Sequence, residues 1–251
     1  MTALITGASS GMGREMARYL STLGYDLILV ARREDRLNAL KNEIKNVKVK
    51  TIVMDISKQE NCFKLYEMTK DADIDFLINN AGFGAYGKVK DVSLERELQL
   101  IDTNIKALHI LTRLYLKDMI AKDSGYILNV GSIAGYLAGP FLASYYASKN
   151  YVVRYTEALR EELRRDKINV KVSVLCPGPV RTEFNKVAGV NFIVSGLDSK
   201  RVAKLAVDKT LKGKMVIIPG AAIKMLKFGL RFLGENLMTR VSYSLQTKRK
   251  N

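Results

Sequence analysis

The sequence predicts an α/β protein with a doubly wound parallel sheet of about seven strands, flanked by helices on both faces. Short apolar segments alternate with amphipathic, helix-like segments along nearly all of the 251 residues. The apolar segments are rich in Val, Ile and Leu and show little polar alternation, which is typical of strands covered on both faces. This regular alternation indicates a parallel sheet with right-handed crossovers.

Seven segments are expected to form strands and six to form helices. The expected strands are Thr2–Thr6, Asp26–Ala31, Val47–Asp55, Phe76–Asn79, Gly125–Gly131, Asn169–Cys176 and Lys214–Pro219. The expected helices lie near residues 11–24, 34–45, 58–71, 93–122, 143–166 and 199–211. Sheets of this kind bind ligands beyond the carboxyl ends of their strands, and the polar motifs of this chain follow those ends.

The composition favours one domain over residues 1–251, because no linker-like or repeated segment divides the chain. The formal net charge of +16 is high, and residues 220–251 form a basic, amphipathic C-terminal extension. Cys62 and Cys176 match no metal or redox spacing, so we expect reduced thiols and no metal site. No apolar run approaches the roughly 18 residues of a spanning helix. The strand that includes Ala3 begins so early that we expect no signal peptide before it. We therefore expect a cytoplasmic protein.

A glycine-rich turn joins the first expected strand to the first helix. Thr6 is followed by Gly7-Ala8-Ser9-Ser10-Gly11-Met12-Gly13. Glycines let the backbone approach a pyrophosphate, and the helix N-terminus offers unpaired N–H groups and a favourable dipole. We therefore expect the phosphates of a dinucleotide to bind at Gly7, Ser9, Ser10, Gly11, Met12 and Gly13.

Two arginines follow the second expected strand. Arg32 and Arg33 come after Ala31, which stands where an NAD-dependent enzyme would have an acid for the ribose 2′-hydroxyl. A guanidinium pairs bidentately with a 2′-phosphate, whereas a carboxylate would repel it. The expected cofactor is therefore NADP(H). Asp55 and Ile56, at the end of the third strand, are assigned to the adenine.

Candidate acid–base residues lie in the second half of the chain. Tyr145 and Lys149 are four residues apart in a helical segment and so share one face. A phenol is a poor base at neutral pH, and a neighbouring ammonium would lower its pKa. Ser132 follows the fifth strand, and Asn104 is a polar residue inside a long apolar helix. Two further motifs end the fourth and sixth strands, namely Asn80-Ala81-Gly82 and Pro177-Gly178-Pro179-Val180-Arg181-Thr182.

With these five motifs in this order, the chain resembles the short-chain dehydrogenases/reductases of about 250 residues over positions 2–219. The resemblance implies a Rossmann-type fold and a catalytic tetrad at Asn104, Ser132, Tyr145 and Lys149. Tyr145 would exchange a proton with the substrate oxygen that Ser132 holds, Lys149 would bind the nicotinamide ribose, and Asn104 would anchor a proton-relaying water. Three further groups of residues take family roles. Asn80, Ala81 and Gly82 would pack against the cofactor, Pro177, Gly178, Val180 and Thr182 would position the nicotinamide, and Asn79 would brace the sheet.

The segment between Thr182 and Ser199 corresponds to the substrate lid of the family. Its larger side chains are apolar and comprise Phe184, Val187, Val190, Phe192, Ile193 and Val194. We therefore expect a small hydrophobic substrate, such as a steroid, an acyl chain or an aromatic ketone. Tyr146, beside the expected catalytic tyrosine, points to another helical face and is expected to serve packing.

The C-terminal extension departs from the common length of the family. In Ala221–Leu233 the cations Lys224, Lys227 and Arg231 form one stripe of an amphipathic helix, and Lys248-Arg249-Lys250 forms a basic tail. Three interpretations stay open for this helix: packing on its own domain, packing on a second subunit, or peripheral contact with an anionic membrane. The family resemblance implies a homodimer or a tetramer, which the extension makes less certain.

The sequence thus predicts an NADP-dependent oxidoreductase of the class EC 1.1.1.-, which reduces a hydrophobic ketone or oxidises the matching secondary alcohol. The alternative is a non-catalytic NADP-sensing regulator, or a membrane-associated binding protein, on the same fold. The complete tetrad favours catalysis. Nucleic-acid binding is not expected, because no aromatic residues are interleaved with the cations in a binding motif.

Overall fold

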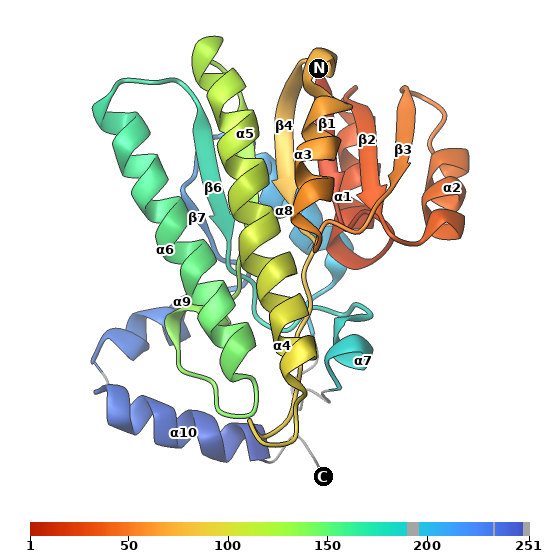
Figure 1. Ribbon diagram of the computed structural model, residues 1–251. Coiled ribbons are helices and arrows are strands. Elements are labelled where there is room, and N and C mark those ends of the chain that lie inside the picture. The colour runs from red at the N-terminus through yellow and green to blue at the C-terminus, as the bar shows by residue number, and fades with distance from the viewer. Residues whose placement is uncertain (190–195, 233, 248–251) are drawn as a thin grey trace.

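The computed structural model describes residues 1–189, 196–232 and 234–247, which include a seven-stranded, all-parallel sheet (Figure 1). The strand order is β3-β2-β1-β4-β5-β6-β7. The strands are β1 (Thr2–Thr6), β2 (Asp26–Ala31), β3 (Val49–Val53), β4 (Ile74–Asn79), β5 (Tyr126–Val130), β6 (Lys171–Leu175) and β7 (Val216–Ile217). The predicted fold class is confirmed, with some strands shorter than expected.

Helices connect the strands and form the C-terminal extension. The α-helices are α1 (Gly11–Thr22), α2 (Glu34–Glu43), α3 (Gln59–Glu67), α4 (Leu94–Ile101), α5 (Leu108–Ala121), α6 (Ala143–Arg165), α7 (Phe184–Ala188), α8 (Ser199–Leu211), α9 (Ala221–Gly229) and α10 (Glu235–Thr247). Shorter turns are η1 (Lys70–Ala72), η2 (Asp102–Ala107), η3 (Ile133–Tyr136) and η4 (Leu230–Phe232). Within the described residues, no helix is long and apolar enough to cross a membrane.

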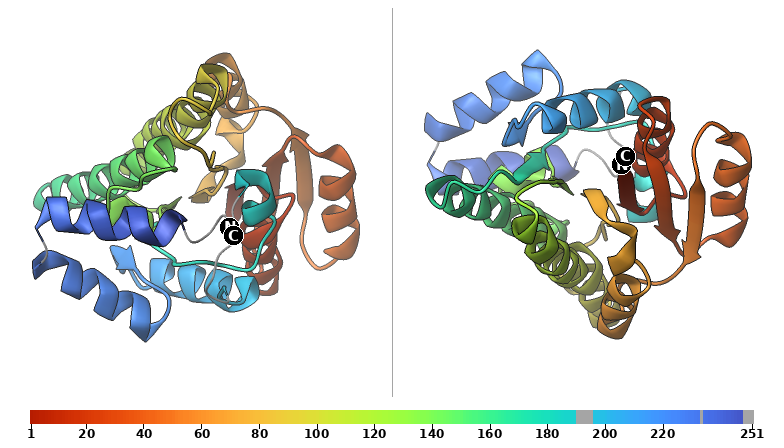
Figure 2. Two further views of the ribbon diagram at one scale, coloured as in Figure 1. Left: turned by 90° about the horizontal axis from the view of Figure 1, so that it is seen from below. Right: turned by 90° about the horizontal axis from the view of Figure 1, so that it is seen from above.

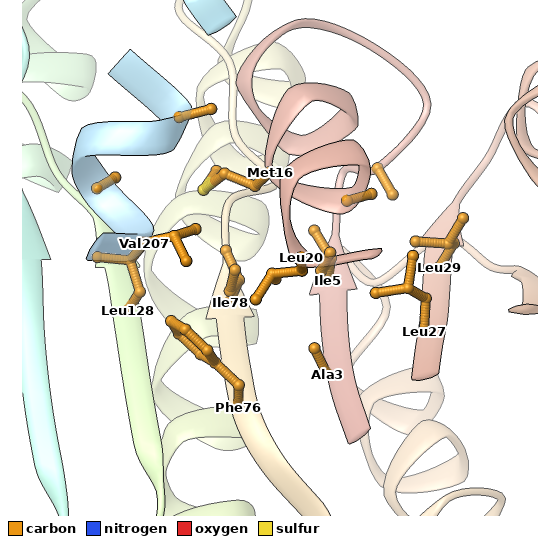
Figure 3. Close-up of a cluster of buried hydrophobic side chains, with 14 of the residues drawn as sticks. Ala3, Ile5, Met16, Leu20, Leu27, Leu29, Phe76, Ile78, Leu128 and Val207 are labelled. Carbon is orange, nitrogen blue, oxygen red and sulfur yellow. The ribbon is translucent and has the colours of Figure 1, made fainter. Parts of the chain in front are cut away.

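The core lies on both faces of the sheet. On one face α1, α2 and α8 cover β-strand residues such as Ile5 and Phe76 through Met16, Leu20 and Val207 (Figure 3). On the other face α3, α5 and α6 bury side chains including Leu65, Tyr115 and Leu163. The central strands therefore bury apolar side chains on both faces of the sheet, which explains why their sequences show little alternation of polar and apolar residues.

The strand order reverses between β1 and β4, so the loops after these two strands diverge and leave a crevice at their carboxyl ends. Asn80, directly after β4, spans this point: its Nδ2 donates to the carbonyls of Thr6 and Gly7 at 3.0 and 3.2 Å. Thr6 Oγ1 accepts from the backbone N–H groups of Asn80 and Ala81. The two polar motifs are thus held together by hydrogen bonds at the switch point.

Asn79 braces the sheet, as the family resemblance implied. It is paired in register with Asn129 of β5, and its Nδ2 donates to Asn129 Oδ1 and to Thr112 Oγ1 of α5, both at 2.9 Å. Asn129 Nδ2 in turn donates to Thr156 Oγ1 of α6 at 3.0 Å. All four side chains are buried, so this network fixes two helices against the central strands.

Two expectations for the helices are wrong in detail. The long helix expected over 93–122 is interrupted by η2, a π-helical turn that contains Asn104. The expected helix Ala221–Leu233 ends at Gly229 and continues as the 3₁₀ turn η4, and α10 follows it as an additional helix that the sequence analysis did not predict. Lys248-Arg249-Lys250 and Val190, Phe192, Ile193 and Val194 lie outside the described residues.

Candidate active site

A cavity of about 380 Å³ opens at the carboxyl ends of the strands. Every residue predicted to bind the cofactor lines it except Gly13, and Ser132, Tyr145 and Lys149 line it as well. Asn104 lies behind the cavity wall. The structure therefore gathers into one space motifs that are up to 175 positions apart in the chain, from Gly7 to Thr182.

The glycine-rich turn has a backbone conformation and close contacts that require glycine. Gly7 has φ +66° and Gly11 has φ +54°, which favour glycine. A Cβ on Gly13 would lie 2.5 Å from Asn80 Nδ2 and 2.5 Å from the Gly7 carbonyl, so Gly13 allows α1 to start close behind the turn. The result is a cradle open to the cavity at a helix N-terminus, which fits the pyrophosphate of a dinucleotide.

Of the two arginines expected at the 2′-phosphate, Arg33 is the one that bonds to the glycine-rich turn. Its Nη2 donates to Ser10 Oγ at 2.8 Å and to Ser9 Oγ at 3.1 Å, so the guanidinium lies beside the glycine-rich turn. Its Nη1 donates to the carboxylate of Glu183 at 2.8 Å. Arg32 lines the same cavity with an exposed side chain. The buried Ala31 at the end of β2 places no carboxylate beside them.

Asp55 lies where it was expected, at the cavity edge after β3, but part of its acceptor capacity is already used. Its Oδ1 accepts from the backbone N–H and the hydroxyl of Ser57 at 3.1 and 2.8 Å. The carboxylate therefore caps the turn before α3 in addition to facing the cavity. Ile56 is buried beside it.

Tyr145, Lys149 and Ser132 meet at the other end of the cavity. The Lys149 ammonium lies 5.8 Å from the centre of the Tyr145 ring, and its Nζ donates to the Val130 carbonyl at 2.7 Å. Ser132 follows β5, and its Oγ accepts from the backbone N–H of Ala134 at 3.1 Å. A hydrogen bond also links Ser132 with the Tyr145 hydroxyl. The arrangement presents two hydroxyls together, with a cation beside them.

The electrostatics differ from the expectation for Tyr145. Burial raises the pKa of its hydroxyl above the ordinary value, and the bond with Ser132 only partly opposes this rise. The reason is that the surrounding protein shields the half-buried phenol from much of the solvent, while the Lys149 ammonium is directed at the Val130 carbonyl rather than at the phenol. Burial also lowers the pKa of Lys149 to about 8. The phenol is thus an acid held in its protonated form.

Asn104 is a buried residue that fixes the cavity wall. Its Nδ2 donates to the Phe83 carbonyl and to Ser148 Oγ, both at 3.0 Å, and its Oδ1 accepts from the Phe83 N–H at 3.1 Å. A Cβ on Gly82 would lie 2.9 Å from Asn104 Oδ1, so the glycine permits this approach. The widened turn η2 brings the amide to the Phe83 backbone and to α6 at once.

The segment after β6 closes the cavity between its two ends. The Pro177 carbonyl accepts from the Ile133 N–H at 2.9 Å, and Val180 pairs with Leu197 in an isolated bridge. Thr182 lies over Gly11, where an added Cβ would meet the threonine methyl at 3.1 Å. Gly178 faces Ile223 of α9, so the C-terminal extension supports this segment from outside.

The sequence analysis missed several residues of the cavity. The missed apolar residues that line the cavity are Phe83, Ile133 and Leu142, and they join Phe184 and Val187, which the sequence analysis had assigned to the lid. Tyr146, expected to serve packing only, also lines the cavity, and its hydroxyl accepts from Gln246 Nε2 of α10 at 2.7 Å. Asn185 has a buried Oδ1 with no hydrogen-bond partner in the described part of the chain. Only the lid residues Phe184 and Val187 carried a sequence signal, namely their apolar character after Thr182.

Among the described residues, no group of three or more His, Cys, Asp or Glu side chains is placed to hold a metal ion. Cys62 and Cys176 are both free and buried. Burial raises the pKa of the Cys176 thiol to about 11 and that of Cys62 to about 12, so both are protonated at neutral pH. The prediction of reduced thiols is therefore confirmed for both residues.

Comparison with known proteins assigns the family. Residues 1–190 match the family model described as short chain dehydrogenase. A very-long-chain 3-oxoacyl-CoA reductase from Coccidioides immitis is 37% identical over 180 residues, which cover 68% of this chain but only 52% of that relative. A sulfoacetaldehyde reductase 2 from Chromohalobacter salexigens is 38% identical over 189 residues, which cover 73% of this chain and 74% of that relative.

Solved structures agree over nearly the whole chain. A short-chain dehydrogenase from Sphingobium yanoikuyae in complex with NADPH has a TM-score of 0.82 at 28% identity, covering 92% of this chain and 94% of that chain. A short-chain dehydrogenase/reductase from Burkholderia phymatum in complex with NAD has a TM-score of 0.83 at 26% identity, covering 90% and 91%. The chain belongs to the short-chain dehydrogenase/reductase family, whose members are NAD(P)-dependent oxidoreductases of alcohol and carbonyl groups.

Proposed function

We propose that this protein reduces a hydrophobic ketone with NADPH. The observation that carries the cofactor choice is the Arg33 guanidinium, which is held against Ser9 and Ser10 at the turn after β1 while Ala31 leaves no acid at the end of β2. A 2′-phosphate placed there would accept from a fixed cationic fork, and no carboxylate of β2 would repel it. The glycine-rich cradle fits the pyrophosphate of the same dinucleotide.

Each residue of the site then has a chemical role. The nicotinamide, when bound, supplies the hydride. Tyr145 donates its hydroxyl proton to the oxygen of the carbonyl, and Ser132 donates a hydrogen bond to that same oxygen as negative charge develops on it. Lys149 places a cation beside the phenol, which stabilises the phenolate left behind. Asn104 is a positioning residue, because it fixes the backbone of Phe83 and the turn of α6 that carries Ser148.

Burial of Tyr145 favours this direction of the reaction. A phenol whose pKa lies above its ordinary value keeps its proton at neutral pH and serves as the acid of a reduction. The reverse reaction, oxidation of an alcohol, would need the phenolate and should require a higher pH. We therefore expect carbonyl reduction to be fastest near neutrality and alcohol oxidation to rise with pH.

The cofactor proposal is tested by fluorescence titration with NADPH and NADH. Wild-type protein should bind NADPH at least tenfold tighter than NADH, and Arg33→Ala should remove most of this difference, which corresponds to about 1.4 kcal/mol. Arg32→Ala is the matched variant, because the Arg32 side chain is exposed and makes none of the bonds to Ser9 and Ser10. Equal binding of the two nucleotides by the wild-type protein would refute the assignment of NADP(H).

The substrate proposal rests on the apolar wall around Tyr145. Phe83, Leu142, Phe184 and Val187 line the same cavity as Tyr145, and their burial of an apolar ligand would contribute the binding energy. The oxoacyl group in the name of one relative fits such a wall, and the sulfonate in the name of the other does not. A panel of aliphatic, aromatic and steroid ketones, with sulfoacetaldehyde as the polar comparison, tests the proposal. Faster turnover of sulfoacetaldehyde would refute it.

We further propose that the C-terminal extension contacts an anionic membrane surface. α9, η4 and α10 expose Met225, Phe228, Phe232, Leu237 and Val241, and Lys224 and Arg240 are exposed among them. Two copies of this basic surface would repel each other, whereas acidic headgroups would attract it. Binding to vesicles that contain phosphatidylserine, and not to pure phosphatidylcholine vesicles, is the expected result. Phe228→Ser should weaken it, and Phe63→Ser on α3, with a similarly exposed ring, should not.

We propose that residues 1–251 act as one domain and that the protein is a cytoplasmic homo-oligomer, as the family resemblance implied. α10 supports the first point, because the Tyr86 hydroxyl donates to the Gln246 carbonyl and Gln246 donates to Tyr146. Removal of residues 220–251 should therefore lower the stability of the remaining chain. Light scattering on the full chain measures the oligomeric state, and a monomer would refute the proposal.

A further inference from the structure

A single acidic side chain links the lid segment to two arginines that follow β2. Glu183 directly follows Thr182, and its two carboxylate oxygens pair with different arginines. Oε2 accepts from Arg33 Nη1 at 2.8 Å, and Oε1 accepts from Arg36 Nη1 at 2.5 Å. Arg33 and Arg36 come from the start of α2, about 150 positions earlier in the chain. The acid therefore links the lid segment to the arginines after β2.

Each of the three nitrogens of the Arg33 guanidinium donates a hydrogen bond in this arrangement. Its Nε and Nη2 donate to Ser9 and Ser10, and its Nη1 donates to Glu183. A phosphate and a carboxylate are both acceptors only, and both prefer the planar donor fork of an arginine. The 2′-phosphate of NADP(H) and the Glu183 carboxylate thus require the same donors of Arg33.

The lid helix α7 begins directly after Glu183. The next residue, Phe184, packs its ring 5.2 Å from the ring of Tyr145. Whatever moves Glu183 moves the first turn of the helix that covers the catalytic tyrosine. In Figure 2, α7 lies beside the elements of the first half of the chain rather than beside α9 and α10.

We propose that Glu183 is a specificity-determining residue: its carboxylate competes with the 2′-phosphate of the cofactor for Arg33 and Arg36, so that NADP(H), but not NAD(H), releases the lid helix α7 from these arginines. The proposal rests on the assignment of NADP(H) above. The contact between α7 and the two arginines would then depend on whether NADP(H) or NAD(H) is bound. It also means that Glu183 weakens the binding of NADPH relative to the affinity that the two arginines alone would provide.

The Glu183 carboxylate, which competes with the phosphate, stays negatively charged at neutral pH. The two arginine partners hold the pKa of the Glu183 carboxyl at about 2. Because protonation does not remove the competitor above about pH 4, only an anionic ligand displaces it. Arg33, Arg36 and Glu183 are each about two-fifths exposed, so solvent screens the pairs and a moderate effect is expected.

The test is a titration of Glu183→Gln with NADPH and NADH at fixed low ionic strength, followed by cofactor fluorescence. The variant should bind NADPH about three- to tenfold tighter than the wild type, with NADH affinity changed less than twofold. Glu34→Gln is the matched control, because Glu34 is an exposed acid adjacent to Arg33 that makes no ion pair with Arg33 or Arg36 in the described structure. It removes the same charge and should leave both affinities within twofold.

A double variant separates competition from a general charge effect. In the Arg33→Ala background, Glu183→Gln should change NADPH affinity less than twofold. Hydrogen exchange of the α7 amides, residues 184–188, should be faster with NADPH than with NADH in the wild type, and equal in Glu183→Gln. Weaker NADPH binding by Glu183→Gln, or no change, overturns the proposal. If wild-type protein prefers neither nucleotide, the assignment of NADP(H) fails instead, so the two failures are distinguishable.

Discussion

The ammonium of Lys149 should destabilise the folded protein at neutral pH, and its removal should raise the free energy of unfolding. Burial lowers the pKa of Lys149 from 10.5 to about 8. At 1.36 kcal/mol per pKa unit, this lowering corresponds to about 3 kcal/mol of folding free energy spent on burying the charge. Lys149→Met removes the charge and keeps the length and apolar stem of the side chain.

The variant also loses the bond from Lys149 Nζ to the Val130 carbonyl, which offsets about 1–2 kcal/mol of the gain. The net expectation at pH 7 is a stabilisation of about 1–2 kcal/mol, or about 2–8 °C in Tm for a chain of this length. Catalytic activity should be lost at the same time. Stability is measured by urea unfolding, followed by far-ultraviolet circular dichroism at one protein concentration.

The pH dependence identifies the cause. The unfolded chain keeps the Lys149 proton up to about pH 10.5, whereas the folded chain releases it near pH 8. Unfolding therefore binds a proton between these values, and the stability that Lys149 costs the wild type below pH 8 is recovered as pH rises to 10.5. The advantage of the variant should shrink between pH 8 and pH 10 and then reverse.

Lys117→Met on α5 is the control, because this lysine is exposed. It should change stability by less than about 0.5 kcal/mol, with no dependence on pH in this range. An unchanged or lower stability of Lys149→Met at pH 7, or a gain that persists undiminished at pH 10, would show that the buried ammonium is not the source of strain in the site.

Three further predictions follow from the geometry. Tyr145→Phe should lower the rate of carbonyl reduction by about 10²–10⁴-fold while the Kd for NADPH stays within twofold, as steady-state kinetics and titration would measure. Asn129→Ala leaves the buried amide of Asn79 and the hydroxyl of Thr156 short of a partner, and should cost about 2–4 kcal/mol in urea unfolding. Gly13→Ala forces a Cβ to 2.5 Å from Asn80 Nδ2 and should weaken nucleotide binding at least tenfold, whereas Gly229→Ala, with open space around it, should not.

The sequence was sufficient to predict the sheet, the cavity edge and most of its lining. This succeeded because strand burial leaves a compositional pattern, and because the carboxyl ends of parallel strands meet at one edge. The π-helical turn at Asn104 was not predictable, since it depends on the Phe83 backbone that the amide reaches from another loop. α10 was missed because its side chains alternate polar and apolar without a clear boundary, and its place depends on contacts with Tyr86 and Tyr146.

The choice between Arg32 and Arg33 illustrates the limit of local patterns. The two residues are chemically identical and adjacent, so the sequence assigned the phosphate to both. The structure separates them because only Arg33 reaches Ser9, Ser10 and Glu183, which come from the first loop and from the lid. The pKa of Tyr145 has the same origin: its direction is set by the burial that surrounding loops impose, not by the lysine four residues away.

Two pairs of polar residues in this protein have opposite consequences for folding. Asn79 and Asn129 bond to each other and to two helices away from the cavity, so their burial holds the sheet together. Tyr145 and Lys149 line the cavity, and burial disfavours the charged form of each. A fold selected only for stability would replace the second pair with apolar residues, as Lys149→Met does. Proton transfer explains why both residues lie at the carboxyl ends of the strands. The phenol would donate a proton to a substrate oxygen there, and the ammonium would stabilise the phenolate, whereas neither group stabilises the fold.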